Sequence, residues 1–233
     1  TRRFMKIKKI LMSISAVILF SMTAAQVQAN SWGIGLKIDS HVLDTGVSDD
    51  IDSNGTINSR ASYEDKATGA SIFVEKNIET GFGNIALGVN YIPFEVDVDR
   101  RSISQTSLTS SGTASTSGTN SAEGTISNHY TLYVQPGMSV GTNSLIYLNF
   151  GLSFADVEGK SVSLSSTDLT ETKDLEGTQL GIGIKRTGDA GGFVKLEYSQ
   201  TDYDKVSWKT DQSTTGHADL DNNILAIAVG KQF

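Results

Sequence analysis

The sequence predicts an all-β protein, an eight-stranded antiparallel up-and-down transmembrane β-barrel. Three observations predict it. Apolar residues recur at every second position in eight separate segments, long and short connections alternate between those segments, and an apolar segment typical of exported proteins lies near the start. Two residues is the side-chain period of a β-strand, so the eight segments are the expected strands.

The composition supports a β-rich, loop-rich chain. Its 233 residues are 38% hydrophobic and include 23 glycines, only 2 prolines and no cysteine. The formal net charge of −7 argues against nucleic acid as a partner, because a protein surface that binds nucleic acid is basic. The absence of cysteine removes disulfides, thiolate zinc sites and catalytic cysteine.

Residues 5–29 have the three parts of a secretory signal peptide. Lysines occupy positions 6, 8 and 9, a short apolar run follows over residues 10–20, and Val27 and Ala29 are the small residues of a cleavage site. The apolar run is shorter than the ~20 residues of a spanning helix. We expect cleavage after Ala29, a barrel domain over residues 30–233, and residues 1–4 to be an upstream artefact.

The expected strands lie at residues 31–39, 69–76, 84–92, 130–135, 145–154, 179–185, 194–198 and 225–233. In each of them one face is apolar and almost free of charge. The opposite face combines charged residues with many glycines and alanines. Small residues weaken an ordinary strand but leave room inside a narrow closed barrel.

The connections strengthen the barrel interpretation. Tight turns at residues 77–83, 138–143 and 187–192 alternate with long polar loops at 40–68, 95–128, 155–177 and 201–220. Membrane barrels have short periplasmic turns and long extracellular loops, and soluble sandwiches have no reason to alternate in this way. Hydrocarbon offers no partner to a strand edge, so the sheet must close.

Five charged residues fall on the inward face: Lys37, Glu75, Lys185, Lys195 and Glu197. An eight-stranded barrel is only wide enough for side chains to fill. We therefore predict a plugged polar interior, in which the three lysines pair with the two glutamates, and no open channel.

Aromatic residues fall at the predicted membrane interfaces. One, Trp32, opens the first strand at the turn end, and the others lie near the long loops: Tyr91, Tyr130, Phe154 and Tyr198. Two aromatic girdles are typical of membrane barrels.

The final segment reads AIAVGKQF and carries Leu225, Ile227, Val229 and Phe233 on its apolar face. It resembles the C-terminal strand of Gram-negative outer-membrane barrels, and the whole chain is similar to the small eight-stranded barrels of the OmpA/OmpX type, without a periplasmic domain. The resemblance implies that the barrel-assembly machinery reads the strand through Phe233. It also implies contact with outer-membrane lipid and lipopolysaccharide, periplasmic termini and a monomer. Lys231 departs from the family pattern, which has an apolar residue there.

The long loops offer one weak metal motif and one low-complexity segment. Asp50, Asp52 and Asn54 match the front half of a calcium loop, but Ala61 stands where the chelating Glu is expected. A solvated acidic loop is therefore the favoured interpretation, and we expect no cofactor. Residues 102–125 are rich in Ser, Thr and Gly, and either extend a hairpin as a polar ribbon or remain mobile.

The alternating pattern of the sequence is compatible with four functions. The favoured one is a structural or surface-interaction role through the long loops, with an unknown extracellular partner. The others are a barrel that transports small or apolar solutes, a lipid A-modifying enzyme, and a secreted lipocalin-like binding protein. We expect no enzyme, because His129 and Thr131 only approximate the His-x-Ser pair of barrel deacylases. Carboxylates at positions 202, 204, 219 and 221 likewise only approximate a barrel protease.

Overall fold

A computed structural model describes residues 30–50, 55–57, 59–81, 83–108, 114–162, 169–209 and 215–233. The predicted signal peptide over residues 5–29, its cleavage site and residues 1–4 lie outside these ranges. Within them, no helix has both the length and the apolar character required to cross a membrane.

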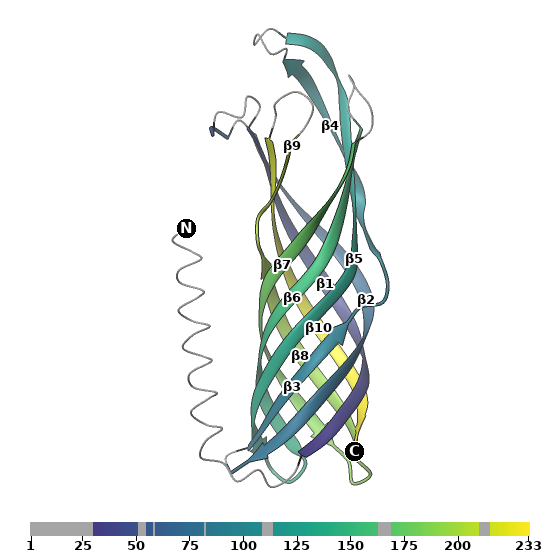
Figure 1. Cartoon of the computed structure of the whole chain (residues 1–233), viewed down its shortest axis with the longest axis vertical. Coiled ribbons are helices and arrows are strands. Elements are labelled where there is room, and N and C mark those ends of the chain that lie inside the picture. The colour runs from purple at the N-terminus through teal and green to yellow at the C-terminus, as the bar shows by residue number, and fades with distance from the viewer. Residues whose placement is uncertain are drawn as a thin grey trace.

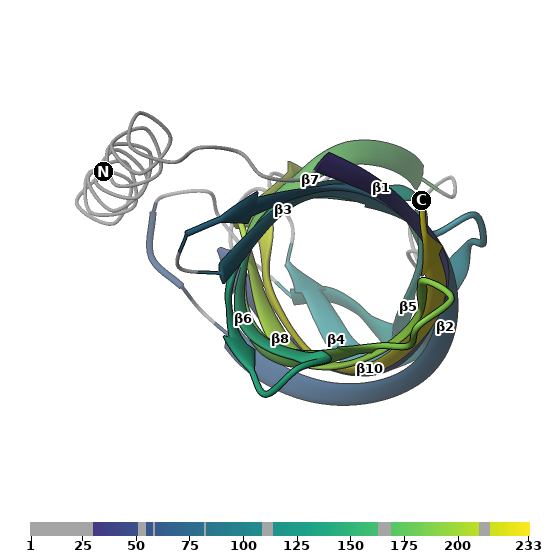
Figure 2. The same ribbon diagram turned by 90° about the horizontal axis from the view of Figure 1, so that it is seen from below.

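The described residues form ten β-strands in one antiparallel sheet. Eight of them close into a ring in the order β1-β2-β3-β5-β6-β7-β8-β10, with β10 paired back to β1 (Figures 1 and 2). The strands are β1 Asn30–Asp50, β2 Ser59–Thr80, β3 Gly83–Tyr91, β4 Val96–Leu108, β5 Ala114–Val140, β6 Ser144–Val162, β7 Leu169–Thr187, β8 Gly192–Tyr203, β9 Val206–Lys209 and β10 Thr215–Gln232. The predicted eight-stranded up-and-down barrel is confirmed.

The apolar face of each strand points outward. Large apolar side chains there are widely exposed, for example Ile38 at 65% and Leu180 at 60%. The alternate side chains of the same strands are buried inside the ring, as β8 shows, where Phe193, Lys195, Glu197, Ser199, Thr201 and Tyr203 are all less than a tenth exposed. A continuous apolar belt of this kind is suited to lipid and not to water. The lipocalin-like alternative is therefore wrong, because it requires the apolar face to point inward.

Three tight turns join strands at one end of the barrel, which we call the turn end; it is the lower end in Figure 1. They follow β2, β5 and β7. Two of them contain a glycine with a positive φ, 70° at Gly141 and 78° at Gly191, a conformation that residues with a Cβ rarely adopt. The opposite end is called the hairpin end.

The predicted long loops are mostly strand, which corrects the sequence-based boundaries. At the hairpin end β1 continues to Asp50 and β2 begins at Ser59, while β4 and β5 form a ribbon from Val96 and Ile126 outward. Once a strand leaves the membrane, its outer face contacts water and no longer requires apolar side chains. The alternating apolar pattern then disappears although the backbone pairing continues.

The wall of the barrel divides into two sheets toward the hairpin end. Strand β3 stops at Tyr91, and beyond it β4 pairs with β5 alone. The pairing of β7 with β8 stops at Gly177 and Tyr203, beyond which β9 pairs with β10 alone. One sheet is thus β2-β1-β10-β9 and the other is β4-β5-β6-β7. The ring is closed along the apolar belt, where lipid offers no hydrogen bonds, and opens where water does.

A backbone irregularity marks the division in β5. Asn128 has a φ of 50°, and the register with β6 shifts between Ser127 and Tyr130. Below this bulge β5 pairs with β3, and above it with β4. Such a bulge redirects a strand and increases its twist.

Candidate functional site

The centre of the barrel interior is a buried ion cluster around Glu75 of β2. The Nζ of Lys185 on β7 lies 3.2 Å from Oε1 of Glu75, and the ammonium of Lys195 on β8 contacts Oε2. The hydroxyl of Tyr133 also donates to Oε2, at 3.1 Å. The Glu75 side chain is completely buried. One carboxylate thus holds two lysines from the opposite side of the barrel.

Two aromatic rings flank these lysines. The Nζ of Lys185 lies 4.3 Å from the ring centroid of Phe193, and that of Lys195 lies 5.0 Å from the centroid of Phe73. The two rings contact each other, with centroids 6.1 Å apart. A cation over an aromatic face is attracted to it, more strongly where water is excluded.

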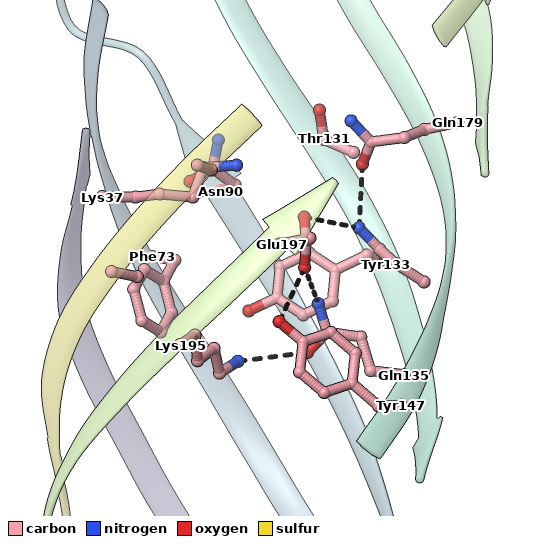
Figure 3. A pocket seen from close by; sticks show the side chains of 13 residues that line it. Lys37, Phe73, Asn90, Thr131, Tyr133, Gln135, Tyr147, Gln179, Lys195 and Glu197 are labelled. Carbon is pink, nitrogen blue, oxygen red and sulfur yellow. Dashed lines mark hydrogen bonds between the residues drawn. The ribbon is translucent and has the colours of Figure 1, made fainter. Parts of the chain in front are cut away.

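Glu197 of β8 is the second buried carboxylate, and neutral donors hold it. It accepts hydrogen bonds of 3.0 Å from Gln135 Nε2, Tyr147 OH and Asn149 Nδ2 (Figure 3). The predicted pairing of Glu197 with a lysine is therefore not formed. Gln135 connects the two carboxylates, because its Oε1 accepts a 3.1 Å hydrogen bond from Lys195.

These contacts belong to one continuous hydrogen-bonded chain along the barrel axis. At the turn end Lys185 donates to Gln232, which in turn donates to Ser31. At the other end Asn149 donates to Gln179, which donates to Thr201. The chain crosses the interior from one wall to the other and includes side chains of seven strands, so it connects opposite walls of the barrel. We call it the polar plug.

Lys37 lies apart from the polar plug, contrary to its predicted role. Its Nζ is 3.2 Å from Oδ1 of Asp39, two residues along the same strand and also inward-facing. Ser71 donates to the other oxygen of Asp39 at 3.2 Å. A nearer carboxylate on its own strand therefore replaces the predicted partners.

Glycines on the inner wall make room for the tyrosines of the polar plug. A Cβ at Gly183 would overlap the ring of Tyr147, and one at Gly88 would overlap the ring of Tyr133. Because these tyrosines donate to Glu197 and Glu75, the small residues noted in the sequence are part of the architecture of the polar plug.

A small cavity remains beside the polar plug. It measures about 30 Å³ and is lined by Lys37, Asn90, Thr131 and Glu197 among others. This is room for one or two water molecules. Among the described residues, nothing donates to the buried Oδ1 atoms of Asn90 and Asn149, which both line it.

An apolar layer lies inside the barrel toward the hairpin end. Ala155, Leu175 and Tyr203 form a buried cluster there. Partly buried apolar side chains pack against it from four strands: Ile126, Val157, Val206 and Leu220. This layer is not evident from the sequence, because its members are single apolar residues within the predicted loops.

Two histidines occupy the interior near this layer. His129 Nε2 lies 2.9 Å from the hydroxyl of Tyr203, and His41 Nδ1 lies 3.0 Å from the amide of Asn222. Thr131 hydrogen-bonds to Ser153 at 2.9 Å and not to His129. The residues considered for a deacylase pair are thus buried and engaged in separate contacts.

The carboxylates considered for a protease have separate contacts or face one another across the sheet. Asp219 pairs with Lys205 at the surface, 3.2 Å away, and Asp202 lies opposite Asp221 in the register of β8 and β10. Among the residues that the structure describes, no three acidic, histidine or cysteine side chains converge as a metal site would require. For the calcium motif, Asp50 accepts a hydrogen bond from the amide of Gly55, while Asp52 and Asn54 lie outside the described residues.

The predicted interface aromatics lie on the outer face of the ring. Tyr91, Tyr130 and Phe154 are neighbours in register across β3, β5 and β6, and the rings of the last two stack 5.0 Å apart. Tyr198 donates to Asn223 on β10. At the turn end Trp32 is paired with Phe233 through the backbone. The outward residues of the final strand, Leu225, Ile227 and Val229, are more than half exposed.

Several solved outer-membrane proteins have similar folds at low sequence identity. Ail of Yersinia pestis shares 12% identity, with 85% of this chain and 99% of that chain covered and a TM-score of 0.39. The Neisserial surface protein NspA shares 9%, with 85% and 97% covered and a TM-score of 0.36. The outer-membrane protease OmpT of Escherichia coli shares 8%, with 90% and 98% covered and a TM-score of 0.47. No curated protein matches the sequence.

A family model gives the decisive match. The model of the outer membrane protein beta-barrel domain aligns with residues 12–233, which include every strand described above. An outward apolar belt and a closed eight-stranded ring are the features that a protein of that membrane requires. The chain belongs to the outer-membrane β-barrel family.

Proposed function

We propose that this protein is a closed outer-membrane barrel that presents two polar β-sheets at the cell surface for contact with another macromolecule. In this orientation the hairpin end is extracellular, and the turn end, with Asn30 and Phe233, is periplasmic. The outer face of the barrel contacts phospholipid and lipopolysaccharide, and the final strand is read by the assembly machinery. The protein acts as a monomer in the membrane and carries no cofactor.

The observation that carries the proposal is the open edge of β4. The 13-residue strand Val96–Leu108 pairs with β5 on one side, with a register shift between Val98 and Arg101, and no strand of the described residues pairs with the other side. An exposed strand edge offers a row of backbone donors and acceptors to an extended segment of a partner. The ribbon lies beyond the apolar belt, where such a partner has access to it (Figure 1).

Deletion of the ribbon tests whether it is required for binding a partner. Replacing residues 98–124 with Asn-Gly removes most of β4 and its pairing partner, because Val98 lies opposite Gly124, and leaves β3 and the lower part of β5. Cells that display the native protein should bind at least one protein of a panel of immobilised extracellular-matrix proteins. The deletion should lower that binding by more than tenfold.

A matched deletion in the other sheet provides the control. Replacing residues 207–217, where Ser207 lies opposite His217, should leave the binding intact. Both variants should keep the heat-modifiable mobility of a folded barrel. Native protein that binds no member of the panel, or equal binding by the β4 deletion, would argue against the proposal.

The filled interior separates this proposal from the transport alternative. The polar plug occupies the middle of the barrel and the apolar layer lies above it, so a stable ion path is not expected. In planar lipid bilayers the purified protein should produce no steady conductance, whereas a general porin added to the same bilayer should. Stepwise currents that change in Lys37→Gln or Glu75→Gln would instead favour transport.

The proposal also treats the protein as non-enzymatic. His129, Thr131 and Ser153 are each less than a tenth exposed and engaged with other interior side chains. A hydrolase for envelope lipid needs a nucleophile and a base that a lipid can reach together.

A further inference from the structure

The outer face of the barrel has opposite charges at its two ends. At the edge of the apolar belt near the turn end, the outward charged side chains of the described strands are cations: Lys76, Arg186 and Lys231. Beyond the belt near the hairpin end most of them are carboxylates, including Asp44, Asp156, Glu176, Asp202 and Asp221. Three of these carboxylates lie in adjacent register on β1, β10 and β8.

Two of the cations border an aromatic pair. Lys76 lies opposite Trp32 in the register of β2 and β1, with its Nζ 5.0 Å from the centroid of the Trp32 ring. Trp32 and Phe233 exchange backbone hydrogen bonds of 3.1 and 2.8 Å across the closure of the barrel. The Nζ of Lys231 lies 6.0 Å from the Phe233 ring. We call these four residues the basic rim patch.

The basic rim patch is open to its surroundings. Trp32 is 56% exposed and Phe233 is 73% exposed, and neither is covered by another part of the described chain. Next to it in register lie Ile34 and Val74, which belong to the apolar belt. Its cations therefore stand where acyl chains end and lipid headgroups begin, the depth at which amphipathic aromatic rings and lysines are favoured.

We infer that the basic rim patch binds the phosphate of an anionic glycerophospholipid, in the leaflet that surrounds the turn end. Lys76 and Lys231 supply ammonium groups to the phosphate, and the Trp32 and Phe233 rings pack against the glycerol and the upper acyl chains. Each lysine near an anionic lipid surface favours the anionic lipid by about fivefold in the binding constant. The carboxylates at the other end repel the same headgroup, so the lipid binds at one end of the barrel only.

The inference is tested by the lipids that the folded protein retains. Full-length protein is exposed in detergent micelles to equal amounts of phosphatidylglycerol and phosphatidylethanolamine, and the bound lipids are counted by native mass spectrometry. The native protein should retain phosphatidylglycerol in preference. The double variant Lys76→Gln/Lys231→Gln should lose about 25-fold of this preference, which is fivefold for each lysine.

The matched control changes two lysines at the opposite end. Lys66→Gln/Lys205→Gln removes the same net charge from side chains that are about half exposed or more, and should leave the preference unchanged. Equal retention of the two lipids by the native protein, or an unchanged preference in the double variant, would overturn the inference. So would a lysine-dependent preference for lipid A over phosphatidylglycerol in a mixture of the two.

This measurement is independent of the surface contact proposed above. Lipid retention depends on the turn end, and binding of a macromolecule depends on the ribbon at the hairpin end. A negative result in one experiment therefore does not change the interpretation of the other. Heat-modifiable mobility of each variant shows that its barrel is closed, so that a lost lipid is not attributed to misfolding.

Discussion

Replacing Glu75 with glutamine should lower the free energy of unfolding by about 3–5 kcal/mol, the usual cost of removing one partner of a buried ion pair. The neutral amide leaves Lys185 and Lys195 in the interior without a counter-ion, where both were paired with the same carboxylate. Burial makes this costly, because neither ammonium can regain the hydration that it lost on folding. Urea titration of the protein folded in lipid vesicles, followed by tryptophan fluorescence, measures the change.

An exposed ion pair provides the control for this substitution. Glu64 pairs with Lys66 at 3.4 Å, and both side chains are more than half exposed. Glu64→Gln should therefore change the free energy of unfolding by less than about 1 kcal/mol. A loss below 1 kcal/mol for Glu75→Gln as well would mean that the polar plug is hydrated and does not contribute to stability as its contacts indicate.

Introducing arginine at Leu148 should cost about 2–4 kcal/mol, because the side chain would enter the lipid near the middle of the membrane. Leu148 lies in the outward belt of β6 and is 46% exposed. Its neighbours along and across the sheet, Ile146, Phe150 and Ile182, are all apolar. The same vesicle-based urea titration applies.

The position of the substitution relative to the membrane is the variable to control. Gln200 of β8 also points outward, but two residues beyond Tyr198 and thus past the predicted aromatic interface. Gln200→Arg should cost about 0–1 kcal/mol, because the guanidinium remains among headgroups and water. Equal costs at Leu148 and Gln200 would contradict a lipid belt at this depth.

Alternation along the strands indicates which side chains face the interior, but not which of them contact one another there. Alternation placed Lys37, Glu75, Lys185, Lys195 and Glu197 on the inward face, and all five lie there. It could not show that Lys37 forms its ion pair with Asp39, or that neutral side chains donate the hydrogen bonds to Glu197. Partner choice depends on the stagger between strands and on the side-chain lengths that meet across the lumen, and neither is visible along a single strand.

The neutral members of the polar plug were also missed, although a signal for them exists. Gln135, Tyr147 and Asn149 occupy alternate positions on the same strands as recognised apolar residues. They could have been assigned to the interior by the same period-two argument. What the sequence lacked was a reason to prefer them over any other inward polar residue, because that reason is the pair of carboxylates on opposite walls.

By itself, the sequence determined that the chain is a closed eight-stranded membrane barrel, because a period of two, an apolar face and alternating connection lengths are local properties of each segment. Only the tertiary structure decided where the strands end, how the wall divides into two sheets and which interior groups pair. Beyond the lipid the outer face of a strand is polar, so the outward apolar pattern stops while hydrogen bonding between strands continues. The basic rim patch likewise exists only because closure of the ring brings Trp32 beside Phe233.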